Sequence, residues 1–489
     1  MKMLNLSMGL LVVLIFTSSC SDFLENPTPA QSLDAESAFT TAADIQTALI
    51  GTYNALQTSD FGSTGLAIND NVLSDNAEWR GSFPSYVDMF NRQLTPDNGE
   101  VEGLWEAGYE VINSTSLILR ALDNSNDPAL TADVANDLRG QALFLRGLSY
   151  FELTRAFAQP YGASSSADIG IPIVTEGTLV SGEITFPARA TVEESYNQAI
   201  SDLTEAQNLL DNSGIPYFAS SLAATAVLAD IAFQQRDYAR AAQLANTVIE
   251  SDAALAASPE EPFVAENSAE IIFAVSNTVQ DNPGVNGSLA TFHHINGRGG
   301  DVIVNQDLLD NGYNAIIPMD QQDEAGDDDL VDLRFALLTS SADPNVINVE
   351  KYEDFANNAD DNIIARVATY YLMRAEALVR TGGDRDEAIE LLNAVRTRAI
   401  VRQDADGAQS DASDIVGFEA DDFDNDDDLL EAIILERRVE LAFERNRLND
   451  LRRLMRDVRG LPFDDPSLVF PIPQRDLDAN DQLVQNPGY

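Results

Sequence analysis

The chain has 489 residues with 44% hydrophobic residues, which is enough apolar material for a large folded body. Its formal net charge is −51, so phosphate backbones repel it and nucleic acid is not an expected partner. Lys2 and Lys351 are the only lysines, and arginine supplies the rest of the positive charge. We interpret the excess of aspartate as adaptation to a salty habitat, with steering of a cationic ligand as the alternative.

The N-terminus has the pattern of a lipoprotein signal peptide. Lys2 precedes an apolar run over residues 10–16, and small residues then lead to Cys20, the only cysteine of the chain. The run is too short to span a bilayer. Residues 1–19 are therefore predicted to be a cleaved signal peptide, and Cys20 is the predicted lipidation site that anchors the chain. An ordinary secretory signal is the alternative.

Helical periodicity follows a short proline-bearing tether over residues 21–31. The spacing of apolar residues predicts helices from Asp34 to Tyr53, from Gly103 to Leu122 and from Asp133 to Ala158. The segment from Asn69 to Pro96 is expected to be loop-like, because its aromatic residues are scattered among polar ones.

Later segments have the pattern of tetratricopeptide-like helix pairs. Residues 228–248 and 371–395 each fit a helix, a short turn with aspartate, and a second helix with alanine at its close-packing positions. A half-match at Gly147–Tyr150 finds its partner helix, Val192–Leu210, only after a long insert, Pro160–Pro187. Such units cannot bury their apolar faces alone, so we expect them to stack.

The remaining C-terminal segments are less regular. Residues 251–362 are predicted to be a loop-rich region with one strand, Ile271–Ser276, and Asp404–Asp428 is predicted to be an exposed loop. A helix with several i,i+3 ion pairs is expected from Leu429 to Val458. The predicted fold is mostly α: a tetratricopeptide-like helical-repeat scaffold with a loop-rich ligand-binding face and few short strands.

Ordered motifs along the chain resemble those of one family, the SusD/RagB-type outer-membrane nutrient-binding lipoproteins of the Bacteroidota. These motifs are Leu49–Leu56, Gly140–Leu153, Gln159–Gly162, Gly170–Pro172, Glu270–Phe273, Arg374–Ala377, Asn393–Arg396, Glu436–Leu441, Asn449–Arg453, Phe470–Pro473 and Gln485–Tyr489. The resemblance covers essentially the whole mature chain. It divides the chain into a SusD-like N-terminal region, 20–215, and a RagB/SusD C-terminal region, 216–489, which form one compact unit.

The resemblance implies a function as well as a fold. Members of this family are helical lipoproteins on the outer face of the outer membrane. They cap a SusC-like TonB-dependent transporter and deliver oligosaccharides or polysaccharides to it. The chain is therefore expected to be a glycan-binding protein and not an enzyme.

Three alternatives remain open: a structural helical-repeat scaffold of the outer membrane, a peptide-binding uptake protein, and a lipid-anchored glycoside hydrolase. No Ser/His/Asp arrangement, second cysteine or phosphate-binding glycine loop favours catalysis.

Sugar binding requires aromatic faces and nearby hydrogen-bonding groups. The loop from Asn76 to Tyr86 contains both, so Trp79, Arg80 and Tyr86 are candidate ligand contacts. We predict that Trp79→Ala weakens glycan binding by about 1–3 kcal/mol without unfolding the protein. The alternative is that Trp79 and Phe83 pack the loop onto the core.

His293 and Arg298 are further candidate ligand contacts, and loop packing is the alternative. His293 and His294 are the only histidines. Adjacent side chains of an extended chain point to opposite sides, so the pair is a poor metal chelate and no metal site is predicted. The aspartates of residues 421–428 supply hard oxygen ligands for Ca²⁺. Asp427 stands where an EF-hand requires glycine, so a solvated acidic loop is preferred and no cofactor is expected.

Overall fold

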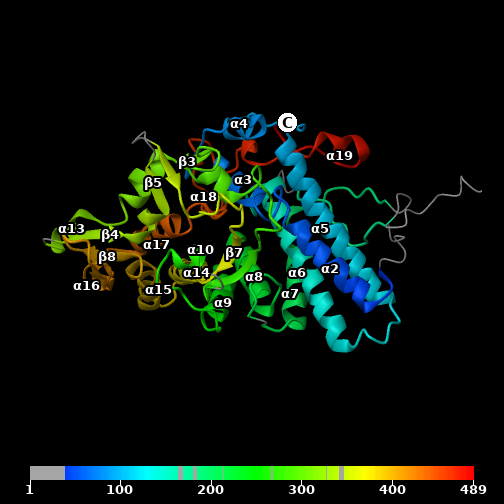
Figure 1. The fold of residues 1–489 in the computed structure, drawn as a ribbon, viewed down its shortest axis with the longest axis horizontal. Helices are drawn as coiled ribbons and strands as arrows, with labels where there is room; N and C mark the ends of the chain where they lie inside the picture. The colour runs from blue at the N-terminus through cyan, green and yellow to red at the C-terminus, as the bar shows by residue number, and fades with distance from the viewer. Residues whose placement is uncertain are drawn as a thin grey trace, which may run out of the picture.

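The structure is a computed structural model that describes residues 39–163, 169–179, 184–212, 214–265, 268–326, 328–340 and 346–489. It is mostly helical, and most of its short strands lie in the half opposite the long N-terminal helices (Figure 1). The predicted signal peptide, Cys20 and the predicted helix start at Asp34 lie outside the described residues. Within the described ranges, none of the helices combines the length and apolar character that crossing a membrane requires.

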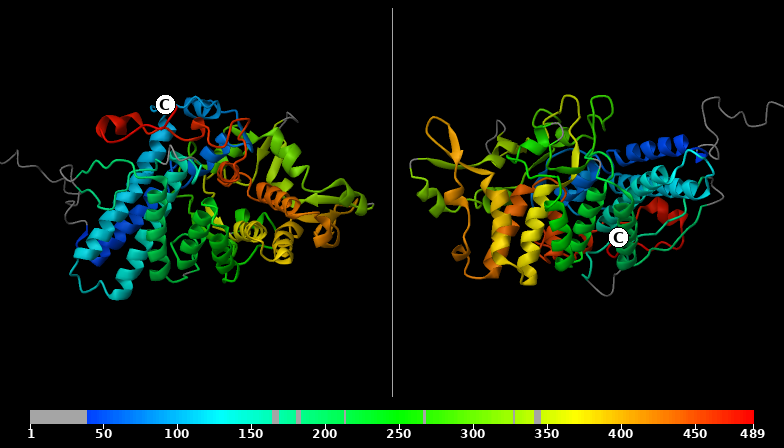
Figure 2. Two further views of the ribbon diagram at one scale, coloured as in Figure 1. Left: turned by 180° about the vertical axis from the view of Figure 1, so that it is seen from behind. Right: turned by 90° about the horizontal axis from the view of Figure 1, so that it is seen from below.

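Long helices form one half of the molecule and lie side by side in Figures 1 and 2. They are α2 (Ala42–Leu56), α5 (Gly99–Asn124), α6 (Ala132–Phe157) and α7 (Val192–Leu209). Their starts follow from polar caps: the Asn98 side chain accepts from the backbone N–H groups of Glu100 and Val101, and Thr191 forms a capping box with Glu194. The predicted helices over 103–122 and 133–158 are confirmed.

Two further helix pairs confirm the tetratricopeptide-like prediction. They are α8 (Ser221–Gln234) with α9 (Tyr238–Ile249), and α14 (Val367–Thr381) with α15 (Arg385–Thr397). Asp237 and Asp384, the aspartates of the predicted turns, cap the second helix of each pair. The predicted pairing of α6 with α7 is also present: a Cβ at Gly147 would lie 2.8 Å from Cγ of Leu203, so the helices touch where a side chain is missing.

The segment predicted to be a loop, 69–96, contains regular structure. It holds most of α3 (Gly65–Leu73), β1 (Ala77–Trp79) and α4 (Pro84–Phe90). The prediction was wrong at α3 because that helix is buried on all sides, Asn69, Asp70 and Asn71 included. These polar residues interrupt the spacing of apolar residues that predicts a helix, so the helix was not recognised from the sequence.

The strands of the described residues form three small antiparallel sheets. The first has the order β1-β3-β6-β5, with β3 (Val302–Val304), β6 (Ile347–Val349) and β5 (Leu338–Ser340). The second pairs β2 (Ile271–Val275) with β7 (Asn362–Arg366), which confirms the predicted strand at 271–276. The expectation of one strand in residues 251–362 was wrong, because β3, β5 and β6 also lie there. The third is β4 (Asp329–Asp332), β8 (Ile400–Gln403) and β9 (Gln409–Asp411). Because β1 and β3 come from opposite sides of residue 215, the first sheet joins the two predicted regions. The division at that residue stays a prediction.

Short helices fill the connections between these elements. They are α10 (Glu261–Val264), α11 (Leu289–His293), α12 (Gln306–Leu308), the π-helix η3 (Leu309–Tyr313), α13 (Met319–Glu324), the 3₁₀-helix η4 (Leu333–Leu337), α16 (Ser413–Val416), the 3₁₀-helices η5 (Ala420–Asp422) and η6 (Pro466–Leu468), and α19 (Gln474–Ala479). The predicted loop 404–428 thus contains β9, α16 and η5, although most of its residues are exposed.

The helix predicted over 429–458 is two helices, α17 (Asp426–Glu440) and α18 (Arg447–Arg453). The chain breaks between them with left-handed backbone at Phe443 (φ 69°) and Arg445 (φ 60°). The break turns Glu444 and Arg445 into the core. There Glu444 pairs with Arg366 at 2.7 Å, and Arg445 pairs with Glu152 at 2.5 Å. These tertiary contacts outweigh local helical propensity.

The predicted i,i+3 ion pairs are mostly replaced by a buried network that ties α17 to distant elements. Arg366 of β7 contacts Glu270 at 2.6 Å and Glu440 at 2.7 Å, and Arg334 contacts Glu436 at 2.6 Å. Burial alone would raise the pKa of Glu440, but the arginine charges around it lower the pKa far below its usual range. The network is therefore ionised and holds α17, β7 and the segment after β4 together.

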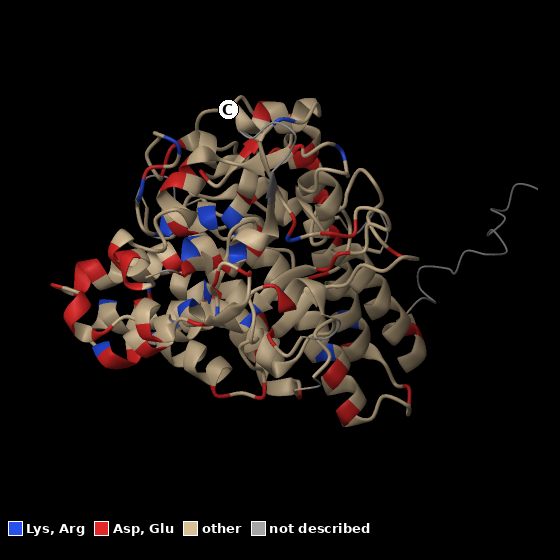
Figure 3. Ribbon diagram, turned by 60° about the vertical axis from the view of Figure 1, so that its left-hand side comes forward, with Lys and Arg blue, Asp and Glu red and all other residues tan. Residues whose placement is uncertain are grey.

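Figure 3 shows how the two signs of charge are distributed. Lysine and arginine segments gather towards the centre of the body, whereas aspartate and glutamate segments also occupy the outer helices and loops (Figure 3). Many of the arginines form buried ion pairs. They therefore do not offset the negative charge of the outer surface, which is strongly acidic.

Candidate ligand-binding site

Two distant segments of the chain meet where β1 pairs with β3. Trp79 lies opposite Val302 in this antiparallel pair. The pairing continues past the strands, because the backbone N–H of Arg80 donates to the carbonyl of Asp301 at 2.7 Å. Residues 78–86 and 289–301 therefore form one surface, which we call the β1–β3 face.

A layer of aromatic rings underlies the β1–β3 face. The ring of Trp79 lies 4.7 Å from that of Tyr86 and 6.0 Å from that of Phe292. The Phe83 ring lies 6.2 Å from that of Phe292 and is only partly buried. Gly81 permits this packing, because a Cβ there would lie 2.4 Å from the indole of Trp79.

The burial of this layer corrects the expected role of two candidates. Trp79 is 6% exposed and Tyr86 is 4% exposed, so neither presents an open ring face to a ligand. Burial raises the pKa of the Tyr86 phenol well above its usual value, and the phenol hydrogen bonds to Glu100 at the start of α5. Both residues support the face from below, as the packing alternative predicted for Trp79.

Arg298 is the candidate whose side chain is held most firmly while it still reaches solvent. Its guanidinium lies 4.1 Å from the centre of the Phe83 ring. Its Nε donates to Asp301 at 2.6 Å and its Nη1 donates to Asn286 at 2.9 Å. The planar group is thus fixed by three partners while it stays partly exposed, which favours recognition of an oxygen-rich ligand.

Arg80 lies on the same face and is exposed. Its side chain pairs with Glu78 at 3.1 Å, and both side chains are open to solvent. An exposed pair of this kind contributes little to stability, at most about 1 kcal/mol. Its donors and acceptors are therefore available for hydrogen bonds to a ligand.

His293 lies under the face and does not reach its surface. The expectation of an extended chain here was wrong, because His293 ends α11. The ring is fully buried, and its Nδ1 contacts the carbonyl of Leu289 at 2.9 Å. Burial lowers the pKa of His293 to about 4, so the ring is neutral at physiological pH. Nδ1–H donates to Leu289, and Nε2 is left to accept from Asn71 at 3.4 Å.

The described residues contain no group of three or more His, Cys, Asp or Glu side chains arranged to hold a metal ion. In the aspartate-rich stretch, the Asn425 side chain accepts from the backbone N–H groups of Asp427 and Asp428 and caps α17. The carboxylates therefore begin a helix, where negative charge is favoured. The prediction of a solvated acidic loop at residues 421–428, and its alternative of calcium binding, both stay untested.

Two family models match the chain. One, described as "Starch-binding associating with outer membrane", matches residues 22–233, and the SusD family model matches residues 345–466. The chain belongs to the SusD/RagB family.

Full-length relatives agree with this assignment. A SusD-like protein of Formosa agariphila is 26% identical over 98% of both chains. A second SusD-like protein of that organism is 24% identical and covers 100% of this chain and 99% of its own. In both relatives the similarity thus extends through the residues between the two family-model matches.

Solved structures show the same fold. A protein described as a putative sugar binding protein, from Bacteroides vulgatus, is 26% identical with a TM-score of 0.75, and the match covers 92% of this chain and 99% of that chain. A SusD superfamily protein from Bacteroides thetaiotaomicron also has a TM-score of 0.75, at 22% identity, over 92% of this chain and 100% of that chain. The mostly α, tetratricopeptide-like prediction is therefore confirmed.

In this SusD-family chain, sequence reasoning missed a third segment beside the face. The rings of His294 and Phe355 stack with centres 4.6 Å apart and planes at 18°, and His294 Nε2 lies 3.8 Å from Glu350. Phe355 is only partly buried. Phe355 is an aromatic residue in a polar run that contains Asn357 and Asn358. The same pattern, an aromatic residue among polar ones, is what identified the loop around Trp79 in the sequence.

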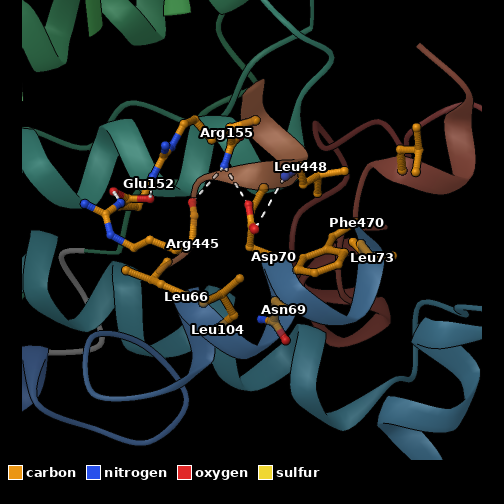
Figure 4. Close-up of a pocket in the computed structure, with 13 residues that line it drawn as sticks. Leu66, Asn69, Asp70, Leu73, Leu104, Glu152, Arg155, Arg445, Leu448 and Phe470 are labelled. Carbon is orange, nitrogen blue, oxygen red and sulfur yellow. Dashed lines mark hydrogen bonds and ion pairs between the residues drawn. The ribbon is translucent and has the colours of Figure 1, made fainter. Parts of the chain in front are cut away.

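A small pocket of about 40 Å³ lies next to α3, and Figure 4 shows the residues that line it. Asp70 points towards α18, and its carboxylate accepts from the backbone N–H of Leu448 at 3.4 Å. Glu152 lies between Arg155 and Arg445 and pairs with both (Figure 4). The volume suits one or two water molecules and no sugar. This cavity is therefore a feature of the core and not a ligand site.

Proposed function

We propose that the chain binds oligosaccharides at the β1–β3 face, with Arg298, Phe83 and Arg80 as direct contacts. The observation that carries the proposal is the guanidinium of Arg298, fixed 4.1 Å over the half-open ring of Phe83. Sugars are recognised by aromatic faces together with planar, polydentate hydrogen-bonding groups. The "Starch-binding" description of the matching family model and the sugar-binding description of one structural relative support this ligand class.

The face is pre-organised for such a ligand. Buried Tyr86 and Phe292 pack against Phe83, and buried Trp79 packs against both of them. Asp301 fixes both the Arg298 side chain and the Arg80 backbone. Little side-chain ordering remains to oppose binding. The stacked rings of His294 and Phe355 extend the aromatic surface along one edge.

We further propose that a lipid on Cys20 holds the protein on the outer face of the outer membrane. There it would pass its ligand to a SusC-like TonB-dependent transporter and leave the ligand chemically intact. The signal-peptide pattern and family membership support this arrangement. Cys20→Ala should move the protein from the membrane fraction to the soluble fraction, and persistence in the membrane would contradict the anchor.

Affinity electrophoresis in gels that contain single polysaccharides tests the binding proposal. Wild-type protein should be retarded by at least one of starch, laminarin, xylan, mannan and alginate. Arg298→Ala should weaken the retardation about tenfold, as for loss of a hot-spot contact. The matched control is Arg402→Ala, which removes an ion-paired arginine near α16, 2.7 Å from Asp414, and should bind like wild type. Equal effects of the two variants, or retardation by none of the polysaccharides, would contradict the proposal.

A further inference from the structure

A second, larger pocket is lined by residues of α5 and α19, two helices that lie next to each other in Figure 1. Its volume is about 400 Å³, within the usual range of small-molecule sites. Its walls come from the first half of α5, from residues 172–174 and 184–187 of the insert, and from α19 with the tail that follows it. We call it the α5–α19 pocket.

The inner wall of the α5–α19 pocket is rigid and aromatic. The rings of Trp105 and Tyr109 lie 4.7 Å apart, and Trp105 packs edge-on against Phe157 at 4.8 Å. The Tyr109 hydroxyl donates to the carbonyl of Pro172 at 2.8 Å, and the Trp105 indole hydrogen bonds to Asp476. The wall is therefore fixed by α19 and by the insert on either side of it.

The mouth of the pocket exposes apolar side chains. Phe186 is 47% exposed and Ile184 is 48% exposed. The backbone that carries Phe186 is nonetheless held, because its carbonyl accepts from Gln482 at 2.5 Å and the next carbonyl, of Pro187, accepts from Asn480 at 3.0 Å. A half-open aromatic ring that projects from a held backbone at the rim of a cavity is a stacking surface for a ligand.

Charged hydrogen-bonding groups occupy the other side of the mouth. Arg475 lies 3.2 Å from Glu106 and 3.6 Å from Glu102, and its side chain is 67% exposed. These exposed pairs are weak and exchange readily with hydroxyl groups. The arginine also offsets part of the acidic charge, which makes the site less suited to a cation.

We propose that the α5–α19 pocket is a second binding site for a neutral sugar ring. Such a ring has an apolar C–H face, which matches Phe186, and hydroxyls at its edge, which match Arg475 and Glu106. This proposal rests on the proposed glycan-binding function and extends it to a second position on the molecule.

The two sites share one helix. Tyr86 of the β1–β3 face bonds to Glu100 in the first turn of α5, and Glu106 at the pocket lies six residues further along that helix. Six residues of α-helix span roughly 9 Å. Glu100, beneath the first site, and Glu106, at the second, therefore lie on neighbouring turns of α5.

The chain offers a separate reporter for each site, because Trp79 and Trp105 are its only tryptophans. Trp79→Phe leaves the indole of the α5–α19 pocket as the sole tryptophan, and Trp105→Phe leaves that of the β1–β3 face. Each variant is titrated with maltohexaose, laminarihexaose, xylohexaose and mannohexaose while emission is recorded. A hexasaccharide that binds wild type in calorimetry should shift the emission of both variants.

Phe186→Ala, made in the Trp79→Phe background, should abolish the Trp105 response. In the wild-type background it should weaken hexasaccharide binding about tenfold in calorimetry. The control Val264→Ala removes a side chain that is 61% exposed elsewhere, and it should change neither signal. Calorimetry on Phe186→Ala alone decides the matter if a tryptophan variant fails to fold.

Two negative results are distinguishable. In the first, wild type binds a hexasaccharide, Phe186→Ala binds it equally well, and Trp105 emission stays constant. This result contradicts the second site and leaves the proposed function intact. If none of the four hexasaccharides binds wild type, glycan binding itself is contradicted, and the second site falls with it.

Discussion

Asp70→Asn should remove the pH dependence that one buried carboxyl imposes on stability. Asp70 is 5% exposed, and its oxygens accept from the backbone N–H of Leu448 and the side chain of Asn449. Burial raises the pKa of Asp70 to about 7 from the ordinary value of 3.8, although the charge of Arg155 opposes the shift. Asp450 adds to the rise, and Arg445 opposes it.

The magnitude follows from linkage between proton binding and folding. Between about pH 4 and pH 7 the folded chain keeps the Asp70 proton, whereas the unfolded chain has lost it. Stability from this residue therefore falls as pH rises through that window. A shift of roughly 3 pKa units corresponds to about 4 kcal/mol. Asparagine does not titrate, so Asp70→Asn should gain about 4 kcal/mol relative to wild type between pH 4 and pH 8.

Urea unfolding at pH 4, 6 and 8 measures the effect. Asp75→Asn is the matched control. Burial would raise the pKa of Asp75, but its hydrogen bond with Arg447 and the charge of Arg447 lower it below its usual value. The stabilisation from that pair is present throughout pH 5–8, so this variant should lose a constant amount over that range. A constant loss for Asp70→Asn as well would refute the reasoning.

Three other substitutions test the core and the face. Arg366→Met should destabilise the protein by about 3–5 kcal/mol in urea unfolding, because it leaves buried carboxylates without their partner, while Arg402→Met at the surface should change little. Trp79→Ala should cost about 3–5 kcal/mol of folding stability, contrary to the expectation of an intact fold, and an unchanged urea midpoint would show that the ring is not a packing element. Phe355→Ala should weaken polysaccharide retardation about tenfold while the melting temperature stays within a few degrees of wild type, and full retention of binding would remove the His294–Phe355 stack from the site.

Local rules predicted the helices well where periodicity and caps agree. The turns at Asp237 and Asp384 were visible because aspartate is a favoured N-cap, and each of the two caps the second helix of its pair. The same rules failed at α3 and at the break between α17 and α18. At both places the local structure depends on buried polar contacts with distant segments, such as that of Glu444 with Arg366. The spacing of apolar residues does not reveal such contacts.

The sequence indicated which loop belongs to the candidate site, but not which of its side chains are open to a ligand. An aromatic, glycine-containing loop indicated the region around Trp79, and the structure brings Arg298 to it through the β1–β3 pairing. Which ring is buried and which is open depends on that pairing, so the sequence ranked Trp79 above Phe83. The α5–α19 pocket was not foreseen, because Trp105 and Phe186 are far apart in the chain and each alone resembles a core residue.

Isothermal titration of the full mature chain with each hexasaccharide, followed by mass analysis of the recovered ligand, tests the central claim most directly. A set of hexapeptides serves as the comparison. The account predicts saturable binding of at least one hexasaccharide, recovery of that sugar uncut, and no binding of the peptides. Shortened sugar products, or heat released by peptides alone, would contradict it.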